Sequence, residues 1–309
     1  MPSLLRGLRR RQRPGASPTY DSWLELLDGD RLDAIEAECA KGGAECYALF
    51  REVDVELWAL LLTQEYDAYP NIRALLPDMP DVELQRLWNG TSGVALAAQG
   101  AGFYRKLCER YGRHSDRPLA ESSVLDFGCG WGRLTRFLAR DVEPSNLYGC
   151  DPVEGILDIC RTNGVPATLA RSGAVPDRLP FDGPFDLAFA FSVFTHLSEA
   201  AHERCLHALH GAIRPGGILV VTVRPPEYVR FCAALHPFAG ADLTRPQYLF
   251  AQHPPDPAHP QYSGGEMSYG EAVISLAYVR ERWAPLFELQ AVDLLVEDLF
   301  QVMLTLRAV

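Results

Sequence analysis

The sequence predicts an α/β protein, built on a largely parallel sheet with helices on both faces and preceded by a helical extension. Short apolar stretches alternate with helical patterns from Ser123 onward, which is typical of parallel strands joined by crossover helices. Residues 185–191 are nearly all apolar, as a strand covered on both faces should be. Two further strand patterns close the chain and predict an antiparallel hairpin.

The first part of the chain predicts a tail followed by helices. Residues 1–20 are polar and rich in turn formers, so we expect them to be mobile. The spacing of apolar residues predicts helices between Trp23 and Tyr66 and another over Thr91–Tyr111. We therefore expect an extension at 1–115 and a second domain at 116–309.

The second domain contains the alternation that forms the sheet. Its parallel strands are predicted at Val124–Phe127, Asn146–Cys150, Val165–Ala170, Phe185–Phe191 and Gly217–Val223. Its helices are predicted at Arg133–Arg140, Val153–Thr162 and Glu199–Ile213. Strands at Phe287–Leu295 and Phe300–Leu306 close the chain, so the expected fold is a Rossmann-like, seven-stranded sheet with an antiparallel last strand.

Residues 225–270 interrupt this alternation. They contain many prolines, aromatic residues and histidines, and we expect an irregular, lid-like insert that carries the substrate pocket. An oligomer contact or a tolerated insertion is the alternative. Its candidate residues are Tyr228, His236, Tyr248, His253, His259, Tyr262, Glu266 and Tyr269. A helix near Ile274–Trp283 follows the insert.

Charge and composition narrow the classes of function. A net charge of −11 argues against a nucleic-acid binder, which needs clustered basic residues. The arginines of residues 6–13 predict a solvated tail, with a weak anchor to an anionic surface as the alternative. We expect neither a transmembrane segment nor a signal peptide. The eight cysteines form no CxxC pair, which predicts reduced thiols in a cytoplasmic protein, and the preference for arginine over lysine hints at a bacterial source.

A glycine-rich turn, Asp126-Phe127-Gly128-Cys129-Gly130-Trp131-Gly132, follows the first strand. Parallel sheets bind ligands at the carboxyl ends of their strands, and glycines let the backbone approach a ligand closely. The helix expected next would point free N–H groups at a polar or anionic group. Asp151 closes the second strand, 19 residues beyond Gly132, where a carboxylate can accept hydrogen bonds from ribose hydroxyls. The turn therefore predicts a nucleotide-like ligand.

The spacing of the glycines argues against a dinucleotide. The GxGxxG fingerprint requires a glycine at its sixth position, and Arg133 stands there. The sequence also lacks a phosphate-cradling P-loop. A nucleoside ligand without a pyrophosphate is favoured over a nicotinamide cofactor.

Four motifs, in this order, resemble those of class I S-adenosylmethionine-dependent methyltransferases. They are the glycine-turn segment Val124–Arg133, then Tyr148–Pro152, Phe185–Leu197 and Arg214–Gly217. The terminal hairpin resembles the reversed last strand of that family. The resemblance covers about residues 90–309 and implies S-adenosyl-L-methionine as the cofactor.

The resemblance also implies roles for single residues around the methionine part of the cofactor. The residues it places there are Asp126, Gly128, Cys129, Gly130, Phe191 and Ser192. Turn formation alone is the other explanation for such glycines and aspartates.

At the nucleoside end, the resemblance implies that Asp151 holds the ribose and that Pro152 lies beside the adenine. Ser172 and Gly173 would approach the adenine ring. Many family members carry an acid there for the adenine amine. Arg171-Ser172-Gly173 departs from that pattern, which leaves the adenine contact open.

Methyl transfer is an in-line displacement, so the protein mainly aligns the nucleophile and excludes water. A hydroxyl or ammonium nucleophile must also lose a proton. His196, just past the fourth strand, is the candidate base, and a capping or packing role is the alternative. We expect no metal site, because His202, His207 and His210 should lie on the surface or between helices.

The sequence thus predicts an S-adenosylmethionine-dependent methyltransferase that acts on oxygen or nitrogen of a small molecule or sugar. A peptide or protein methyltransferase is one alternative, and a catalytically silent cofactor-binding regulator is another. The acceptor is expected to be neither a nucleic acid nor a membrane-spanning partner. A homo-oligomer stays open.

Overall fold

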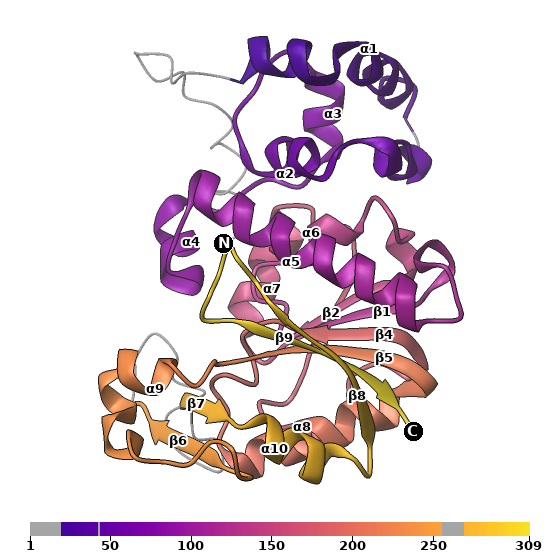
Figure 1. The fold of residues 1–309 in the computed structure, drawn as a ribbon. Coiled ribbons are helices and arrows are strands. Elements are labelled where there is room, and N and C mark those ends of the chain that lie inside the picture. The colour runs from indigo at the N-terminus through magenta and orange to yellow at the C-terminus, as the bar shows by residue number, and fades with distance from the viewer. Residues whose placement is uncertain (1–19, 43, 255–268) are drawn as a thin grey trace, which may run out of the picture.

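The structure, a computed structural model, describes residues 20–42, 44–254 and 269–309 of the 309-residue chain. Its main strands are β1 Val124–Phe127, β2 Leu147–Asp151, β3 Thr168–Arg171, β4 Phe185–Ala190, β5 Ile213–Val223, β8 Phe287–Leu294 and β9 Val302–Ala308. They form one sheet in the order β3-β2-β1-β4-β5-β9-β8 (Figure 1). β1 to β5 pair in parallel, and β9 is antiparallel to β5 and β8. The expected α/β, Rossmann-like sheet with an antiparallel last strand is confirmed.

The extension is helical, as expected. Its elements are α1 Asp21–Cys39, the 3-10 helix η1 Ala44–Glu52, α2 Val55–Thr63, α3 Pro70–Leu75, α4 Val82–Asn89 and α5 Gly93–His114. Asp54 and Asp81 begin α2 and α4, because each carboxylate accepts backbone N–H bonds from the first turn. Gly90 ends α4 with a left-handed φ of 70°.

The remaining helices belong to the sheet domain. They are η2 Leu119–Glu121, α6 Thr135–Leu138, η3 Pro144–Asn146, α7 Glu154–Thr162, α8 Glu199–Ala212, α9 Tyr228–Phe231, η4 Ala233–Phe238, α10 Leu276–Tyr278 and the π-helix η6 Val279–Trp283. α5 lies on one face of the sheet and α8 with α10 on the other (Figure 1). The core divides accordingly, since Leu187 and Phe189 of β4 pack on the first face and Ala188 and Ala190 on the second.

The insert at 225–270 is more regular than expected. It contains α9, η4 and two strands, β6 Tyr248–Gln252 and β7 Gly270–Ile274, which pair antiparallel in a second sheet (Figure 1). The Ala272 amide donates to the Thr195 carbonyl at 2.8 Å, and the Gly270 amide donates to the His196 carbonyl at 2.9 Å. The described part of the insert is thus more regular than expected and is hydrogen-bonded to the segment after β4, while a function as a lid stays a prediction.

Two parallel strands begin at other residues than predicted. β3 begins at Thr168 rather than Val165, because Pro166 has no N–H to donate to a ladder. β5 begins at Ile213 rather than Gly217, and a register shift against β4 accommodates the additional residues.

Two helices are shorter than predicted. The helix after the glycine turn covers only α6 rather than Arg133–Arg140, although the flanking residues Leu134 and Ala139 keep right-handed backbone angles. The helix predicted near Ile274–Trp283 begins after Ser275, because Ile274 is the last residue of β7. The Ser275 side chain caps it by accepting the Tyr278 amide.

Some features concern the whole described chain. Residues 20–42, 44–254 and 269–309 contain no helix that is long and apolar enough to cross a membrane. Within the same ranges, no group of three metal-ligating side chains could hold a metal ion. All eight cysteines are free thiols. The arginine-rich residues 6–13 lie outside the described residues.

Candidate functional site

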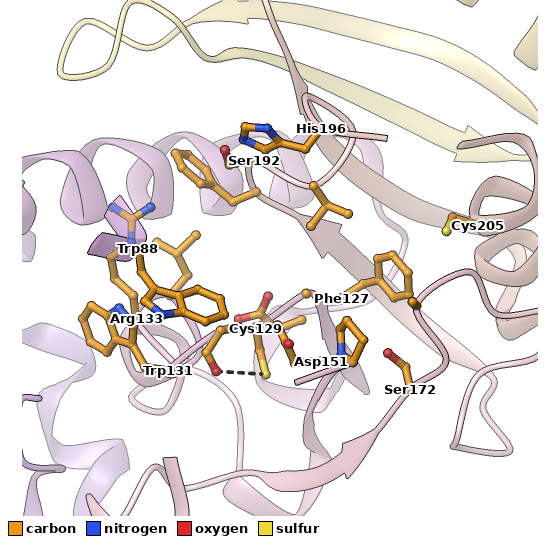
Figure 2. A pocket seen from close by; sticks show the side chains of 18 of the residues that line it. Trp88, Phe127, Cys129, Trp131, Arg133, Asp151, Ser172, Ser192, His196 and Cys205 are labelled. Atoms are coloured by element: carbon orange, nitrogen blue, oxygen red, sulfur yellow. Dashed lines mark hydrogen bonds between the residues drawn. The ribbon is translucent and has the colours of Figure 1, made fainter. Parts of the chain in front are cut away.

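A cavity opens at the carboxyl edge of the sheet, where β1, β2 and β4 end. It encloses about 990 Å³, its mouth included. The residues predicted from the sequence that line it are Asp126, Gly128, Cys129, Gly130, Asp151, Pro152, Ser172, Gly173, Phe191, Ser192 and His196. Figure 2 shows His196 and Ser192 on one side of this cavity and Cys129 and Asp151 on the other. The fold therefore brings every predicted site residue to one place, while the role of each stays a prediction.

The glycine turn leaves no room for a side chain at Gly128 or Gly132. Gly128 has a φ of 77°, and a Cβ there would lie 2.4 Å from Cγ2 of Val193. A Cβ on Gly132 would lie 2.8 Å from Cγ2 of Val165. The Gly128 amide is tied to the Cys150 carbonyl at 2.8 Å. Because α6 has only four residues, the backbone of the turn itself faces the cavity, and the expected contribution of a helix N-terminus stays a prediction.

Two buried carboxylates flank the turn. Oδ2 of Asp126 accepts the Thr135 hydroxyl at 2.6 Å, and Oδ2 and Oδ1 of Asp151 accept the Gly130 and Val153 amides at 3.0 and 2.9 Å. Burial raises the pKa of Asp126 to about 7. Burial also raises the pKa of Asp151 to about 6, against the two amides that lower it. Each carboxylate oxygen has two lone pairs, so Asp151 can still accept bonds from ligand hydroxyls.

Ser192 holds a backbone conformation that serine rarely adopts. Its φ is 60°, in the left-handed region, immediately after β4. The Ser192 amide donates to Oγ1 of Thr222 at 2.7 Å, and Nε2 of Gln301 donates to the Ser192 hydroxyl at 3.1 Å. Strain held in place by such contacts is found at functional sites, and here it turns the chain after β4 along the cavity wall.

Trp131 in the turn and Arg133 next to it also line the cavity, although neither was assigned to the site from the sequence. Trp131 lines the cavity, and its indole N–H donates to the Asn89 side chain at 2.8 Å, which ties the end of α4 to the turn. Arg133 also lines the cavity, is 7% exposed, and lies 4.7 Å from the Phe191 ring centroid. Burial lowers the pKa of Arg133 to about 10. Its position directly after the glycines was the available signal, because a buried arginine on a cavity wall can receive a ligand carboxylate.

The end of the cavity at which the adenine is expected, around Ser172 and Gly173, lacks the acidic side chain of the motif pattern, as the sequence indicated. Ser172 is buried, and its amide donates to the Asp151 carbonyl at 3.1 Å. The Arg171 guanidinium turns away to the Pro152 carbonyl at 3.2 Å. Ser172 therefore offers a hydroxyl where an acid is common, since the neighbouring lining residue Gly173 has no side chain.

His196 lies at the opposite end of the cavity. Its ring stacks on Tyr269 with centroids 4.8 Å apart, and Nδ1 lies 2.8 Å from the Gly270 carbonyl. Because a carbonyl only accepts, Nδ1 carries the proton and Nε2 keeps its lone pair. Burial lowers the pKa of His196 to about 4. The ring is therefore neutral at neutral pH and can accept a proton at Nε2.

The other predicted histidines do not join the site. His202 is fully buried between helices, one of the two expected positions, because it packs against Tyr278 of α10 and Trp283 of η6, and its ring stacks on Tyr248 with centroids 5.2 Å apart. His207 is exposed, and His210 lies near the end of α8 against the C-terminal carbonyl.

The described candidate residues of the insert lie in three places, one of which is the contact of Tyr248 with His202. Tyr228, His253 and Tyr269 lie around Glu271 near His196, while His236 is exposed and contacts the Arg230 carbonyl. His259, Tyr262 and Glu266 lie outside the described residues. The expected link between insert and cavity thus rests on the residues of and near β7.

Comparison with known proteins adds a family. Residues 124–217 match a family model described as a methyltransferase domain. The chain is 29% identical over 150 residues to the ubiquinone biosynthesis O-methyltransferase of Rhizobium etli, which is 47% of this chain and 58% of that protein. It is 31% identical over 108 residues to the trans-aconitate 2-methyltransferase of Deinococcus radiodurans, which is 35% of this chain and 39% of that protein. The chain thus spans less than two thirds of either relative.

A solved structure is also similar. The S-adenosylmethionine-dependent methyltransferase from Mesorhizobium loti has a TM-score of 0.44 and 20% sequence identity, over 68% of this chain and 99% of that one.

The strand order, the reversed β9 and the glycine turn with its buried aspartates agree with the resemblance to class I S-adenosylmethionine-dependent methyltransferases that the sequence motifs indicate. The match to the methyltransferase-domain family model is confined to residues 124–217, less than half of the 309-residue chain.

Proposed function

We propose that this chain transfers the methyl group of S-adenosyl-L-methionine to an oxygen or nitrogen atom of a small molecule or sugar. The observation that carries the proposal is the single cavity that joins the glycine turn, Asp151 and His196. The relatives named as O-methyltransferase and trans-aconitate methyltransferase support a small acceptor. The net charge of −11 supports an acceptor other than nucleic acid.

The chemistry of the cavity fits this cofactor. Asp151 offers a carboxylate to two ribose hydroxyls, and the closed glycine turn offers close backbone approach without a pyrophosphate cradle. Arg133 offers a positive charge to the carboxylate of a methionine part. The cofactor supplies a methyl group on a positively charged sulfur.

In the proposed reaction, the residues of this chain orient the acceptor and remove its proton. The acceptor atom forms a bond to the methyl carbon as the sulfur–carbon bond breaks and its electron pair stays on sulfur. The proton of the acceptor passes to Nε2 of His196, the nitrogen that faces away from the Gly270 carbonyl. The aromatic wall formed by Phe191 and Tyr269 excludes water from this end.

The cytoplasm is the location we propose, on the ground of eight unpaired cysteines. A sugar acceptor and a homo-oligomer are also parts of the proposal. Identification of the methylated compound tests the first, and the molecular mass in solution tests the second.

Calorimetric titration with S-adenosylmethionine, S-adenosylhomocysteine and NAD tests the proposal. We expect the first two to bind and NAD not to bind. Replacing Asp151 with alanine should weaken S-adenosylhomocysteine binding by about 1–3 kcal/mol, because two hydrogen bonds to a charged group are lost. Asp158→Ala is the matched control, since Asp158 is an exposed acid on α7 that pairs only with Arg161. No binding of either adenosyl compound would refute the proposal, and an unchanged affinity in Asp151→Ala would refute the ribose contact.

A further inference from the structure

Glu271 lies at the centre of a polar cluster behind His196. The cluster consists of Glu271, His253, Arg224 and Tyr228, and it joins β7 to the end of β5 and to α9. Glu271 is 8% exposed although it carries a carboxylate. Removing a carboxylate from water costs free energy, so a buried carboxylate is usually surrounded by charged or polar partners.

Both oxygens of Glu271 have partners. Oε2 accepts the Tyr228 hydroxyl at 3.0 Å and lies 3.5 Å from Nη2 of Arg224. Oε1 lies 3.3 Å from Nε2 of His253 and 3.8 Å from Nδ1 of His196. The carboxylate is thus held between two histidines, and the nearer contacts fix its position relative to the His196 ring.

We propose that Glu271 is a positioning residue that sets the basicity of His196 for removal of the acceptor proton. The inference rests on the proposed function and deepens it. The Gly270 carbonyl holds the proton on Nδ1, which leaves Nε2 free to accept. When Nε2 accepts a proton, the ring becomes positive, and the Glu271 carboxylate beside Nδ1 stabilises that charge.

The surroundings of His196 explain why such a partner is needed. Burial lowers the pKa of the His196 ring, and the charges of Arg224 and the neighbouring His253 act in the same direction. The carboxylate of Glu271 is the group that raises the pKa most. The stacked ring of Tyr269 adds attraction for a cation on its face. Without Glu271, the basicity of His196 would fall further.

The proposal gives the insert a function. Gly270, Glu271 and Tyr269 all belong to β7 or the residue before it, and His253 follows β6. The pairing of these strands therefore brings the groups that control His196 to the end of β4 (Figure 1). The methyltransferase-domain match ends at residue 217, so these groups lie outside the matched segment.

The test is nuclear magnetic resonance of the full-length protein with 15N-labelled histidine. Long-range 1H–15N spectra report which ring nitrogen is protonated, and the His196→Gln variant assigns the signal. In the unmodified protein we expect Nδ1 to carry the proton at neutral pH. In Glu271→Gln we expect the proton affinity of His196 to fall about tenfold, so that protonation begins at lower pH.

Two further variants make the test specific. Glu271→Asp keeps the negative charge but moves it away from His196 by one methylene group. We expect a smaller decrease in the proton affinity of His196 in this variant, which keeps the test valid if Glu271→Gln fails to fold. Glu288→Gln, an exposed acid on β8, should leave the titration of His196 unchanged. A proton on Nε2, or an unchanged titration in the Gln and Asp variants, would overturn the inference. S-adenosylhomocysteine binding is measured on the same samples, since its absence in the unmodified protein would refute the proposed function and not the role of Glu271.

Discussion

Gly128 and Ser192 are residues at which the backbone itself shapes the cavity. Both have a positive φ, 77° at Gly128 and 60° at Ser192. The glycine is predictable from the sequence, because only glycine enters this region without strain. The left-handed serine is not, since it is held by Thr222 and Gln301, residues far away in the sequence.

Replacing Gly128 with alanine tests the closeness of this packing. The left-handed conformation costs about 1–2 kcal/mol in alanine, and the new Cβ would also displace Val193, which lines the cavity. We expect a loss of stability in chemical denaturation and at least about tenfold weaker binding of S-adenosylhomocysteine, which corresponds to roughly 1.4 kcal/mol.

Gly164→Ala is the matched control for this substitution. Gly164 has a φ of 72°, and a Cβ there meets nothing within 4 Å. It should lose stability through backbone strain alone and bind the ligand normally. Equal ligand affinity in both variants would contradict the close packing of the turn.

His202 is a buried histidine outside the cavity. It is fully buried among Phe194, Tyr248, Tyr278 and Trp283, and neither ring nitrogen has a partner within the described residues. Burial lowers the pKa of His202 to about 3. The folded protein therefore contains this ring in its neutral form.

The lowered pKa of His202 predicts sensitivity to acid. The unfolded chain binds the proton near the ordinary value of 6.5 and the folded chain only near 3. The stability is therefore full above about pH 6.5 and is lost as the pH falls toward 3, by roughly 4 kcal/mol for this residue. Urea unfolding at several pH values should show a shallower loss in His202→Leu than in the unmodified protein. His207→Ala, at an exposed position, should keep the original dependence, and an equally steep loss in His202→Leu would contradict this account.

At the scale of elements, α4 connects the helical extension to the glycine turn. Trp88 and Asn89 form its last turn, and both line the cavity. A Cβ on Gly130 would lie 3.4 Å from the Trp88 ring, so this ring covers the turn. The buried Arg136 adds a second tie, because it donates to the carbonyls of Gly132 and Asp78.

Asn89→Ala should release α4 from the turn. The variant loses the hydrogen bond from the Trp131 indole, a net change of about 1 kcal/mol. We expect faster dissociation of S-adenosylhomocysteine in stopped-flow fluorescence, with a small loss of stability. Glu83→Gln, an exposed change on the same helix, should keep the original dissociation rate. Identical rates in Asn89→Ala and the unmodified protein would show that α4 does not retain the ligand.

The elements differ in how far the sequence could predict them. The boundaries of the short apolar strands β1, β2 and β4 follow from the local sequence pattern. The glycine turn and Asp151 are predictable from the local sequence in the same way. β6 and β7 could not be predicted in this way, because they pair with each other across residues 253–269 and with the chain after β4. Glu271 was missed for the same reason, since its partners come from β5, α9 and two separate loops.

At the scale of the whole molecule, the extension and the sheet share one core. A single apolar cluster includes Phe50 and Trp58 of the extension together with Phe137, Phe189 and Met303 of the sheet domain. The Trp58 indole donates to the Phe137 carbonyl at 3.0 Å. The division after residue 115 remains a prediction, and this shared core argues that the two parts fold together.

A chain that begins at residue 116 tests this coupling. Without α5, the face of the sheet at Phe189 and Met303 would be exposed to water. We expect the shortened chain to lack cooperative thermal unfolding and to bind no S-adenosylhomocysteine. A chain that lacks only residues 1–19 should keep cooperative thermal unfolding and S-adenosylhomocysteine binding. A stable, ligand-binding fragment from residue 116 would contradict the shared core.

The central claim is that the glycine turn and Asp151 form the binding site for S-adenosylmethionine, with His196 at the methyl end. A crystal structure with S-adenosylhomocysteine tests it most directly. The account predicts ribose hydroxyls on the Asp151 carboxylate, the sulfur between Gly128 and Ser192, and Nε2 of His196 open toward the sulfur. A ligand bound elsewhere, or a ribose without contact to Asp151, would contradict it.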